Sequence, residues 1–169
     1  IERVDPMTGQ PDPNGQALRG YRYSRGWADD QKVYFYAEFS KPFKDFKVIR
    51  GDIQIWQDEF KDMAAFAHAY FEAEPQEQVM MKVALSPVSM EGARRNLKAE
   101  IKTFDFDRVR AATRNEWNTT LSAIEIADAD TQQKEVFYTC LYFAHLYPQL
   151  YSDVTGEYRS SDSKVYRGK

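Results

Sequence analysis

Cysteine is almost absent from this 169-residue chain, which limits the covalent means of holding a fold together. The single cysteine, Cys140, has no partner for an internal disulfide, and its place on the apolar face of an expected helix predicts a small buried side chain. The two histidines, His68 and His145, lie far apart and have no partner cysteines, which argues against a zinc site.

Long apolar runs and long basic runs are also missing. No stretch of about 18 apolar residues occurs, so we expect no membrane-spanning helix in this sequence. The net charge of −3, with acidic and basic residues interspersed, argues against a nucleic-acid partner, because such surfaces usually carry a basic patch. Neither a signal peptide nor an initiator Met precedes Ile1, so we expect a chain cut from a longer protein.

Aromatic residues are abundant by contrast. They make up 15% of the chain, with eleven Tyr and eleven Phe, and the hydrophobic share of 43% is typical of a globular protein with a core. This aromatic content fits a carbohydrate-binding surface, and it equally fits a β-rich core.

The first half of the chain carries strand signals. Residues 1–19 are rich in turn-forming residues and predict an exposed loop. Alternation with a period of two in Val33–Phe39 predicts a strand with one buried face. Further strands are expected in Phe46–Trp56, with a turn near Gly51, in Ala64–Phe71 and in Gln78–Leu85. Antiparallel strands at this spacing predict a β-sandwich.

The period changes to that of helices after residue 87. Ser89 is an expected N-cap, followed by Met90, Ala93, Leu97 and Ile101 on one helical face. A second helix is expected from near Asp105. A third begins at Asp130, where Gln133 completes a capping-box pattern, and Pro148 is expected to stop it. Strands followed by helices predict an α+β chain, or two domains with a boundary near residue 87.

Three ordered stretches resemble glycoside hydrolase family 92, a family of calcium-dependent, inverting exo-α-mannosidases found mainly in bacteria. They are GYRYSRGWADDQKVYFYAEFSKPF from Gly20, VSMEGARRNLKAE from Val88, and FYTCLYFAHLYPQLYSDVTGEYR from Phe137. Any one of these stretches alone would be weak evidence for the family. Together they span residues 20–169, and the ordered set is specific.

The resemblance implies a division of the chain and an activity for its parent. Residues 1–87 resemble the C-terminal part of an N-terminal β-sandwich, 88–129 the linker helices, and 130–169 the first helix and loop of an (α/α)6 barrel. The parent is expected to remove terminal α-linked mannose, with α-1,2 the expected linkage, from glycans such as N-glycans. The catalytic acid, the catalytic base and the calcium ligands are expected outside this chain, which would leave it inactive alone. A secreted, periplasmic or cell-surface location in bacteria is also implied.

Four residues are candidates for contact with a sugar. Asp153 lies in the loop SDVTGEYR, where a carboxylate could accept hydrogen bonds from two hydroxyls, or instead form an Asx-turn near Gly156. Asp162 lies where the family often has an aspartate, although Ser-Ser-Asp-Ser replaces the usual Gly or Met neighbours. Arg159 could orient a hydroxyl or the Asp153 carboxylate, or be solvated. Trp27 could stack on a pyranose ring or lie in the core.

Two other classes of function remain open from the residues. One is a non-catalytic carbohydrate-binding module built on the sandwich and the Asp153 loop. The other is a structural piece that packs against the remainder of the parent chain. Apolar helix residues such as Val136, Phe137 and Leu141 would then be exposed in this chain alone, and we expect self-association through them.

Overall fold

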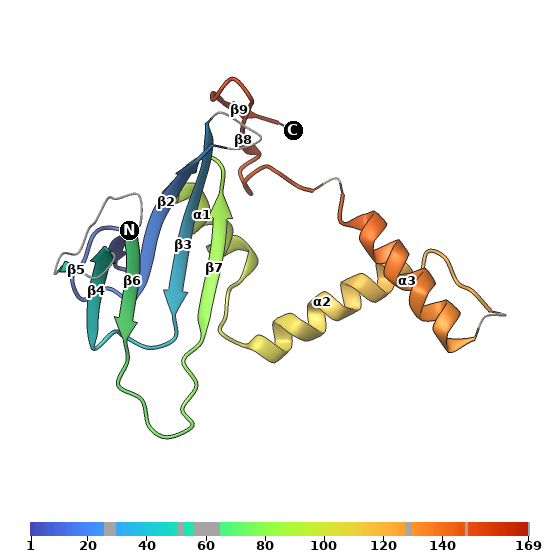
Figure 1. The fold of residues 1–169 in the computed structure, drawn as a ribbon, viewed down its shortest axis with the longest axis horizontal. Coiled ribbons are helices and arrows are strands. Elements are labelled where there is room, and N and C mark those ends of the chain that lie inside the picture. The colour runs from blue at the N-terminus through green and yellow to red at the C-terminus, as the bar shows by residue number, and fades with distance from the viewer. Residues whose placement is uncertain (26–29, 51–52, 56–64, 128–129, 148, 169) are drawn as a thin grey trace. The chain divides into compact units, whose positions relative to one another are not determined.

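The computed structural model describes two compact units, which are treated separately (Figure 1). The sheet unit comprises Ile1–Phe104 together with Ser152–Lys169, and the helical unit comprises Asp105–Tyr151. The structure describes residues 1–25, 30–50, 53–55, 65–127, 130–147 and 149–168. Antiparallel sheets come first and helices follow, so the predicted α+β class is confirmed.

Two antiparallel sheets and a small hairpin form within the described part of the sheet unit. The four-stranded sheet has the order β1 (Glu2–Val4), β2 (Ala17–Ser24), β3 (Gln31–Phe39) and β7 (Met81–Ser86). The three-stranded sheet has the order β5 (Ile53–Ile55), β4 (Asp45–Arg50) and β6 (Ala65–Tyr70). The hairpin pairs β8 (Glu157–Arg159) with β9 (Val165–Arg167).

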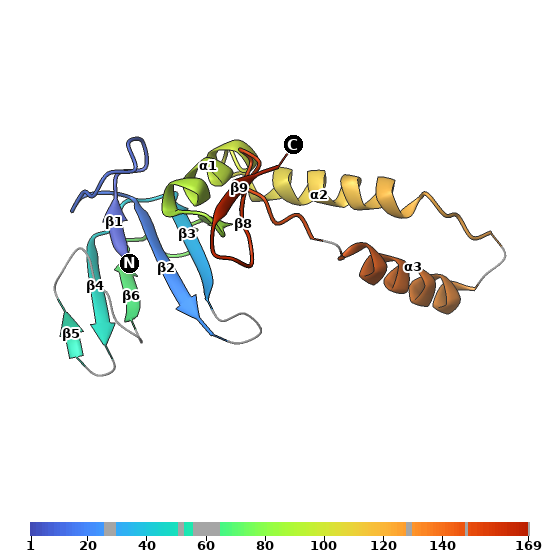
Figure 2. The same ribbon diagram turned by 90° about the horizontal axis from the view of Figure 1, so that it is seen from above.

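Helix α1 (Met90–Glu100) covers one face of the four-stranded sheet, and the three-stranded sheet packs against the β2 and β3 part of the other face (Figure 2). The α1 side holds a fully buried cluster: Val4, Ala17, Tyr36, Ala93 and Leu97. The other side holds Leu18, Phe43, Phe46 and Val48, with Phe35 and Phe39 packed against them. The prediction of one buried face for residues 33–39 is therefore wrong, because α1 covers the face that carries Tyr36 and Glu38.

Strand β7 shows the same effect of α1. Its polar-looking face, with Lys82 and Ser86, is buried beneath α1, whereas Met81, Val83 and Leu85 are exposed. Lys82 is tolerated there because its ammonium forms an ion pair with the buried Glu38 (3.1 Å) and donates to the Ile101 carbonyl (3.2 Å). Lys98 reaches the other oxygen of Glu38 at 2.6 Å. A buried carboxylate thus has two cationic partners, which offsets the cost of its desolvation.

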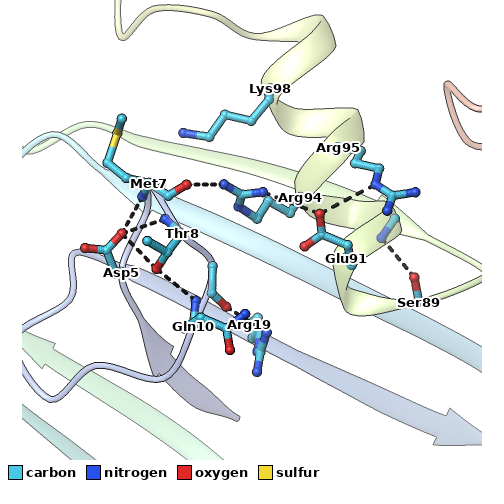
Figure 3. A network of polar contacts seen from close by, with 12 residues as sticks. Asp5, Met7, Thr8, Gln10, Arg19, Ser89, Glu91, Arg94, Arg95 and Lys98 are labelled. Atoms are coloured by element: carbon cyan, nitrogen blue, oxygen red, sulfur yellow. Dashed lines mark hydrogen bonds and ion pairs between the residues drawn. The ribbon is translucent and has the colours of Figure 1, made fainter.

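The N-terminal residues are not the exposed loop that the sequence predicts. They include β1, and Val4 is fully buried in the α1 core. After β1 the chain turns over α1, where Arg94 donates to the Met7 carbonyl and forms an ion pair with Glu91 (Figure 3). The Asp5 carboxylate accepts from the backbone nitrogens of Met7 and Thr8, both at 2.7 Å. The Thr8 hydrogen bond is the main reason that the pKa of Asp5 is lowered.

The helical unit contains α2 (Phe106–Leu121) and α3 (Thr131–His145). The predicted N-caps Asp105 and Asp130 are confirmed, and Asp130 and Gln133 form the full capping box. Trp117 and Tyr142 join the two helices, with ring centroids 4.5 Å apart. Pro148 lies outside the described residues, and α3 ends before it, at His145.

No residue of α2 or α3, both described throughout, is buried. The expectation of a buried Cys140 is therefore wrong: its side chain is exposed, because no other element of the described helical unit covers that side of α3. Between the two helices an open groove of about 630 Å³ is lined by Leu121, Thr131, Lys134, Glu135, Tyr138, Thr139, Tyr142 and Phe143. Among the described residues, no helix is both long enough and apolar enough to cross a membrane.

Candidate functional site

Residues 152–168 follow the helical unit in sequence but pack on the sheet unit, and their anchor is Asp153. Its side chain is only 3% exposed. The Ser86 hydroxyl donates to Oδ2 of Asp153 at 2.7 Å, and the Asn96 amide donates to Oδ1 at 2.9 Å. The carboxylate therefore joins the end of β7 and the middle of α1. A direct bond to a sugar would have to replace one of these contacts or share an oxygen with it.

Two residues of α1, Asn96 and Gly92, explain how Asp153 fits so closely. Asn96 also accepts from the Val154 backbone nitrogen and donates to the Leu85 carbonyl, both at 2.9 Å. Gly92 lies beneath the carboxylate: a Cβ at this position would collide with Asp153 and lie 2.6 Å from the Ser86 hydroxyl oxygen. Only glycine therefore lets the loop approach the first turn of α1 this closely.

The turn after Asp153 is closed by the backbone rather than by the side chain. The Gly156 nitrogen donates to the Asp153 carbonyl at 2.8 Å, and the Asp153 nitrogen donates to the Glu157 carbonyl at 2.8 Å. Gly156 has φ +79°, a left-handed conformation that glycine adopts without strain. The Asx-turn considered for Asp153 is therefore not formed, because both of its side-chain oxygens bond to Ser86 and Asn96.

Arg159 holds the β8–β9 hairpin against the chain between β7 and α1. Its Nε donates to the Pro87 carbonyl at 2.8 Å, and its Nη2 donates to the Val88 carbonyl at 3.0 Å. The remaining nitrogen, Nη1, donates to the Ser163 carbonyl at 2.7 Å. The side chain is half-buried and is occupied by backbone carbonyls, so it is not the freely solvated arginine that was one of the alternatives.

Asp162 lies in the turn of the same hairpin and is the more accessible of the two predicted aspartates, with a side chain 43% exposed. Its Oδ2 accepts from the Tyr166 hydroxyl at 2.7 Å, and its Oδ1 accepts from the Lys164 backbone nitrogen at 3.0 Å. These hydrogen bonds, that of Tyr166 first, lower the pKa of Asp162. Asp162 therefore offers an ionised carboxylate to solvent in a fixed orientation.

The hairpin turn meets the chain just before the start of β3, near the end of β2 (Figure 1). Polar and aromatic side chains lie together there. The Ser163 hydroxyl donates to Asp30 at 3.1 Å, and Asp30 forms an ion pair with Lys32 at 2.8 Å. The Lys32 ammonium lies 5.3 Å from the centre of the Tyr23 ring. Lys32 is also the first cause of the lowered pKa of Asp30.

Tyrosines continue this surface along the sheet. Tyr21 pairs across the strands with Tyr34, and its ring centre is 4.8 Å from that of Tyr23. Burial, followed by a hydrogen bond to Tyr23, raises the pKa of Tyr34. These tyrosines were not among the predicted site residues, although their alternation in paired strands was a usable signal. Trp27, the fourth predicted sugar contact, lies outside the described residues.

A calcium site requires several oxygen ligands close together. Among the described residues, no three His, Cys, Asp or Glu side chains come together as a metal site would require. The carboxylate of Asp153 is bonded to neutral donors, and Asp30 is paired with Lys32. These residues do not fit a calcium site, so no step is assigned to calcium through them.

Two family models match the chain in sequence order. Residues 4–86 match the N-terminal domain of glycosyl hydrolase family 92, and residues 92–169 match the catalytic domain of the same family. No curated protein matches the chain.

Solved structures agree with the family models. A family GH92 α-mannosidase from Bacteroides thetaiotaomicron is 28% identical, with a TM-score of 0.81, over 94% of this chain and 22% of the mannosidase. Its complex with mannoimidazole matches with a TM-score of 0.80, at 28% identity, over 94% and 21%. A family GH92 inverting mannosidase from B. thetaiotaomicron VPI-5482 is 27% identical, with a TM-score of 0.76, over 93% and 22%. The chain thus spans about a fifth of the length of these proteins.

Proposed function

The chain belongs to glycoside hydrolase family 92, and from that premise we propose that its parent protein removes terminal α-linked mannose from glycans. The observation that carries the proposal is the ordered match of both domain models over nearly the whole chain, together with α-mannosidase structures at 27–28% identity. The chain alone has no turnover in this proposal, because we expect the catalytic acid and base elsewhere in the parent.

The reaction is proposed to invert the anomeric centre. In such a reaction one carboxylic acid protonates the leaving oxygen while a second carboxylate activates water on the opposite face of the sugar. We propose α-1,2-linked mannose, as in N-glycans, as the preferred substrate, and calcium as the cofactor, bound by residues other than the described ones. A secreted, periplasmic or cell-surface location in bacteria belongs to the same proposal.

The exposed end of the β8–β9 hairpin is the proposed contribution of this chain to sugar binding. Asp162 has an accessible, oriented carboxylate that could accept hydrogen bonds from vicinal hydroxyls. Trp27 remains a candidate for stacking on the ring. Asp153 and Arg159 support this surface from beneath, because their polar atoms bond to Ser86, Asn96 and backbone carbonyls.

The parent protein is tested on α-1,2-, α-1,3- and α-1,6-mannobiose, with calcium or with a chelator, while NMR identifies the anomer first released. We expect β-mannose, fastest from the α-1,2 substrate and only with calcium. A folded parent that releases no mannose from any of the three would overturn the proposal. Release of α-mannose would overturn only the inverting mechanism.

Asp162 is tested in the same protein by Asp162→Asn. Loss of a charged hydrogen-bond acceptor for the sugar is expected to lower kcat/KM by about 10- to 100-fold. The matched control is Asp107→Asn, the same change at an exposed position in the first turn of α2. If both variants keep the parent's kcat/KM, Asp162 does not contact the sugar.

A carbohydrate-binding module is the second candidate, and the tyrosine surface of β2 and β3 is the observation that favours it. Tyr21, Tyr23 and Tyr34 lie together near Lys32, and aromatic rings beside polar groups suit a pyranose. Saturable binding of mannose by this chain, lost in Tyr23→Ala, together with a folded but inactive parent, would favour the module. If this chain does not bind mannose and the folded parent is inactive, the remaining candidate is a structural piece that packs against the rest of the parent chain.

We propose that the 169-residue chain, when produced without the rest of its parent protein, self-associates through its helical unit. Val136 and Phe143 are exposed on α3, next to the groove between the helices. Large exposed apolar patches promote association. Sedimentation at rising concentration should show dimers or larger species, and Phe143→Ser should reduce them. A chain that remains monomeric throughout would contradict this.

A further inference from the structure

We propose that Asn96 and Ser86 are positioning residues: by holding the Asp153 carboxylate they fix the β8–β9 hairpin, and with it Asp162, on the sheet unit. Asp153, Asn96 and Ser86 are called the Asp153 clamp below. The inference rests on the proposed function, because the value of the clamp for the reaction depends on Asp162 meeting the sugar. No sequence pattern had singled out Asn96 or Ser86.

The clamp joins β7, α1 and the loop that follows the helical unit. Ser86 ends β7, Asn96 lies in α1, and Asp153 follows the whole helical unit, 57 residues after Asn96. Asn96 uses both ends of its amide, since its nitrogen donates to Asp153 and to the Leu85 carbonyl while its oxygen accepts from the Val154 nitrogen. Asp153 is therefore held at one buried point by two successive elements, β7 and α1, that lie 67 and 57 residues before it at Ser86 and Asn96.

The β8–β9 hairpin has little stability of its own. Strands β8 and β9 contain three residues each, and an isolated two-stranded hairpin of this length is marginally stable in water. Its position depends on contacts with the sheet unit. These are the clamp, the bonds from Arg159 to the Pro87 and Val88 carbonyls, and the contact between Ser163 and Asp30.

The clamp is sensitive to the loss of a single hydrogen-bond donor. Asp153 is 3% exposed and its two oxygens have one side-chain donor each, so removing a donor leaves a buried carboxylate oxygen without its partner. Asn96→Asp replaces the donating amide nitrogen with an oxygen of similar size that faces the Asp153 oxygen and the Leu85 carbonyl. The change is nearly isosteric, so its effect is electrostatic rather than a loss of volume.

Amide hydrogen exchange on the 169-residue chain measures the clamp without any sugar. The reporters are the Ser160 and Gly168 nitrogens, which donate to the Lys164 and Gly156 carbonyls within the hairpin. In Asn96→Asp we expect them to exchange about tenfold faster or more, while amides of β2 and β3 keep their rates. The matched control, Asn118→Asp on exposed α2, should leave all of these rates unchanged.

A swapped pair provides a rescue. In Asn96→Asp/Asp153→Asn the amide at position 153 can donate to the carboxylate at position 96, and Ser86 keeps an acceptor. Hairpin protection should return in part, because the bond to the Leu85 carbonyl stays broken. A general loss of packing would not be rescued by this exchange. Failure of the swap to restore any protection would therefore overturn the clamp.

Two further outcomes decide the inference. Unchanged exchange at Ser160 and Gly168 in Asn96→Asp overturns it. If Asn96→Asp unfolds the whole unit, Ser86→Ala replaces it as the test, because it removes one donor only. Its exchange rates at Ser160 and Gly168 are compared with those of the β2 and β3 amides. Faster exchange confined to the hairpin then supports the clamp, and loss of protection in step with β2 and β3 overturns it.

Titration with methyl α-mannoside separates the clamp from the proposed function. If the chain binds this sugar and Asn96→Asp weakens binding about tenfold, the positioning role is supported. If the chain binds it and Asn96→Asp binds equally well, the positioning role fails. If the chain binds none of it while the exchange pattern holds, the clamp stands and the proposed sugar contact of Asp162 in this chain fails.

Discussion

Helices α1 and α3 begin alike and end in different surroundings. Each has a side chain at its N-cap that accepts a backbone hydrogen bond, and each carries apolar residues at helical spacing. In the sheet unit, α1 buries Ala93 and Leu97 completely against the four-stranded sheet. In the helical unit, α3 buries no residue. A local helix signal therefore specifies the helix in both units, but full burial requires a broad partner surface. Among the described residues α1 packs against a sheet, whereas α3 packs against α2 alone.

The largest effect of burial is expected at the buried ion pair between Glu38 and Lys82. Glu38→Gln leaves the Lys82 ammonium in the core without its partner carboxylate, and we expect the free energy of unfolding of the sheet unit to fall by about 3–5 kcal/mol. Glu72→Gln, which breaks the exposed pair with Lys44, should change it by less than about 1 kcal/mol. Denaturant titration gives both values. Equal effects would mean that the burial of Glu38 does not matter.

Leucine truncation sharpens the contrast between the two units. Leu97→Ala should cost about 2–5 kcal/mol, because it leaves a cavity in a fully buried cluster. Leu141→Ala makes the same change in α3, where no residue is buried, and should cost less than about 1 kcal/mol. Thermal unfolding followed by circular dichroism measures the two. A cost at Leu141 as large as that at Leu97 would show that α3 has a packed core partner.

Removal of either N-cap should destabilise its own helix equally, but only the loss of the α1 cap should destabilise the whole sheet unit. Ser89→Ala and Asp130→Ala each remove one capping bond, worth about 1 kcal/mol. We expect Ser89→Ala to lower the unfolding midpoint of the sheet unit as a whole, since α1 is part of its core. Asp130→Ala should only reduce the NMR helical shifts of α3. A lower midpoint of the sheet unit in Asp130→Ala would show that α3 also contributes to the stability of that unit.

The smallest expected effect is the titration of the hairpin. Asp162 has a lowered pKa in the folded chain, chiefly through the Tyr166 hydroxyl, so its contribution to stability is present above its ordinary pKa of 3.8. That contribution is lost as the pH falls through the lowered pKa. Tyr166→Phe should move the pKa of Asp162 upward, as measured by the carboxyl carbon shift. An unchanged value would remove Tyr166 as the cause.

Local signals predicted much of the fold. The caps at Ser89, Asp105 and Asp130 were all correct, because a capping bond spans only three residues. Strand β3 was also placed correctly. The faces of β3 and β7 were harder, since whether Tyr36 or Lys82 is buried depends on where α1 packs, and α1 follows β3 by some fifty residues. Lys82 looks exposed by residue type, and only its pairing with Glu38 makes burial possible.

In the candidate site, too, the sequence predicted some of the residues and missed others. In the loop SDVTGEYR the predicted Asp153 is buried, whereas the predicted Asp162 further along the chain is accessible, as a sugar contact must be. Its use by a sugar, like that of Asp153, Arg159 and Trp27, stays a prediction. Asn96 was missed although it lies beside Leu97, because a polar residue next to a buried helix position has no signature without its partner.

The sequence by itself determined the N-caps of α1, α2 and α3, the position of β3, and the family of the chain. These depend on bonds between neighbours, or on motifs that are contiguous in the chain. Only the tertiary structure decided which face of each strand is buried, and that Asp153 bonds to Ser86 and Asn96. The physical reason is distance along the chain: these contacts join segments separated by tens of residues, and their energies exist only when the segments have packed together.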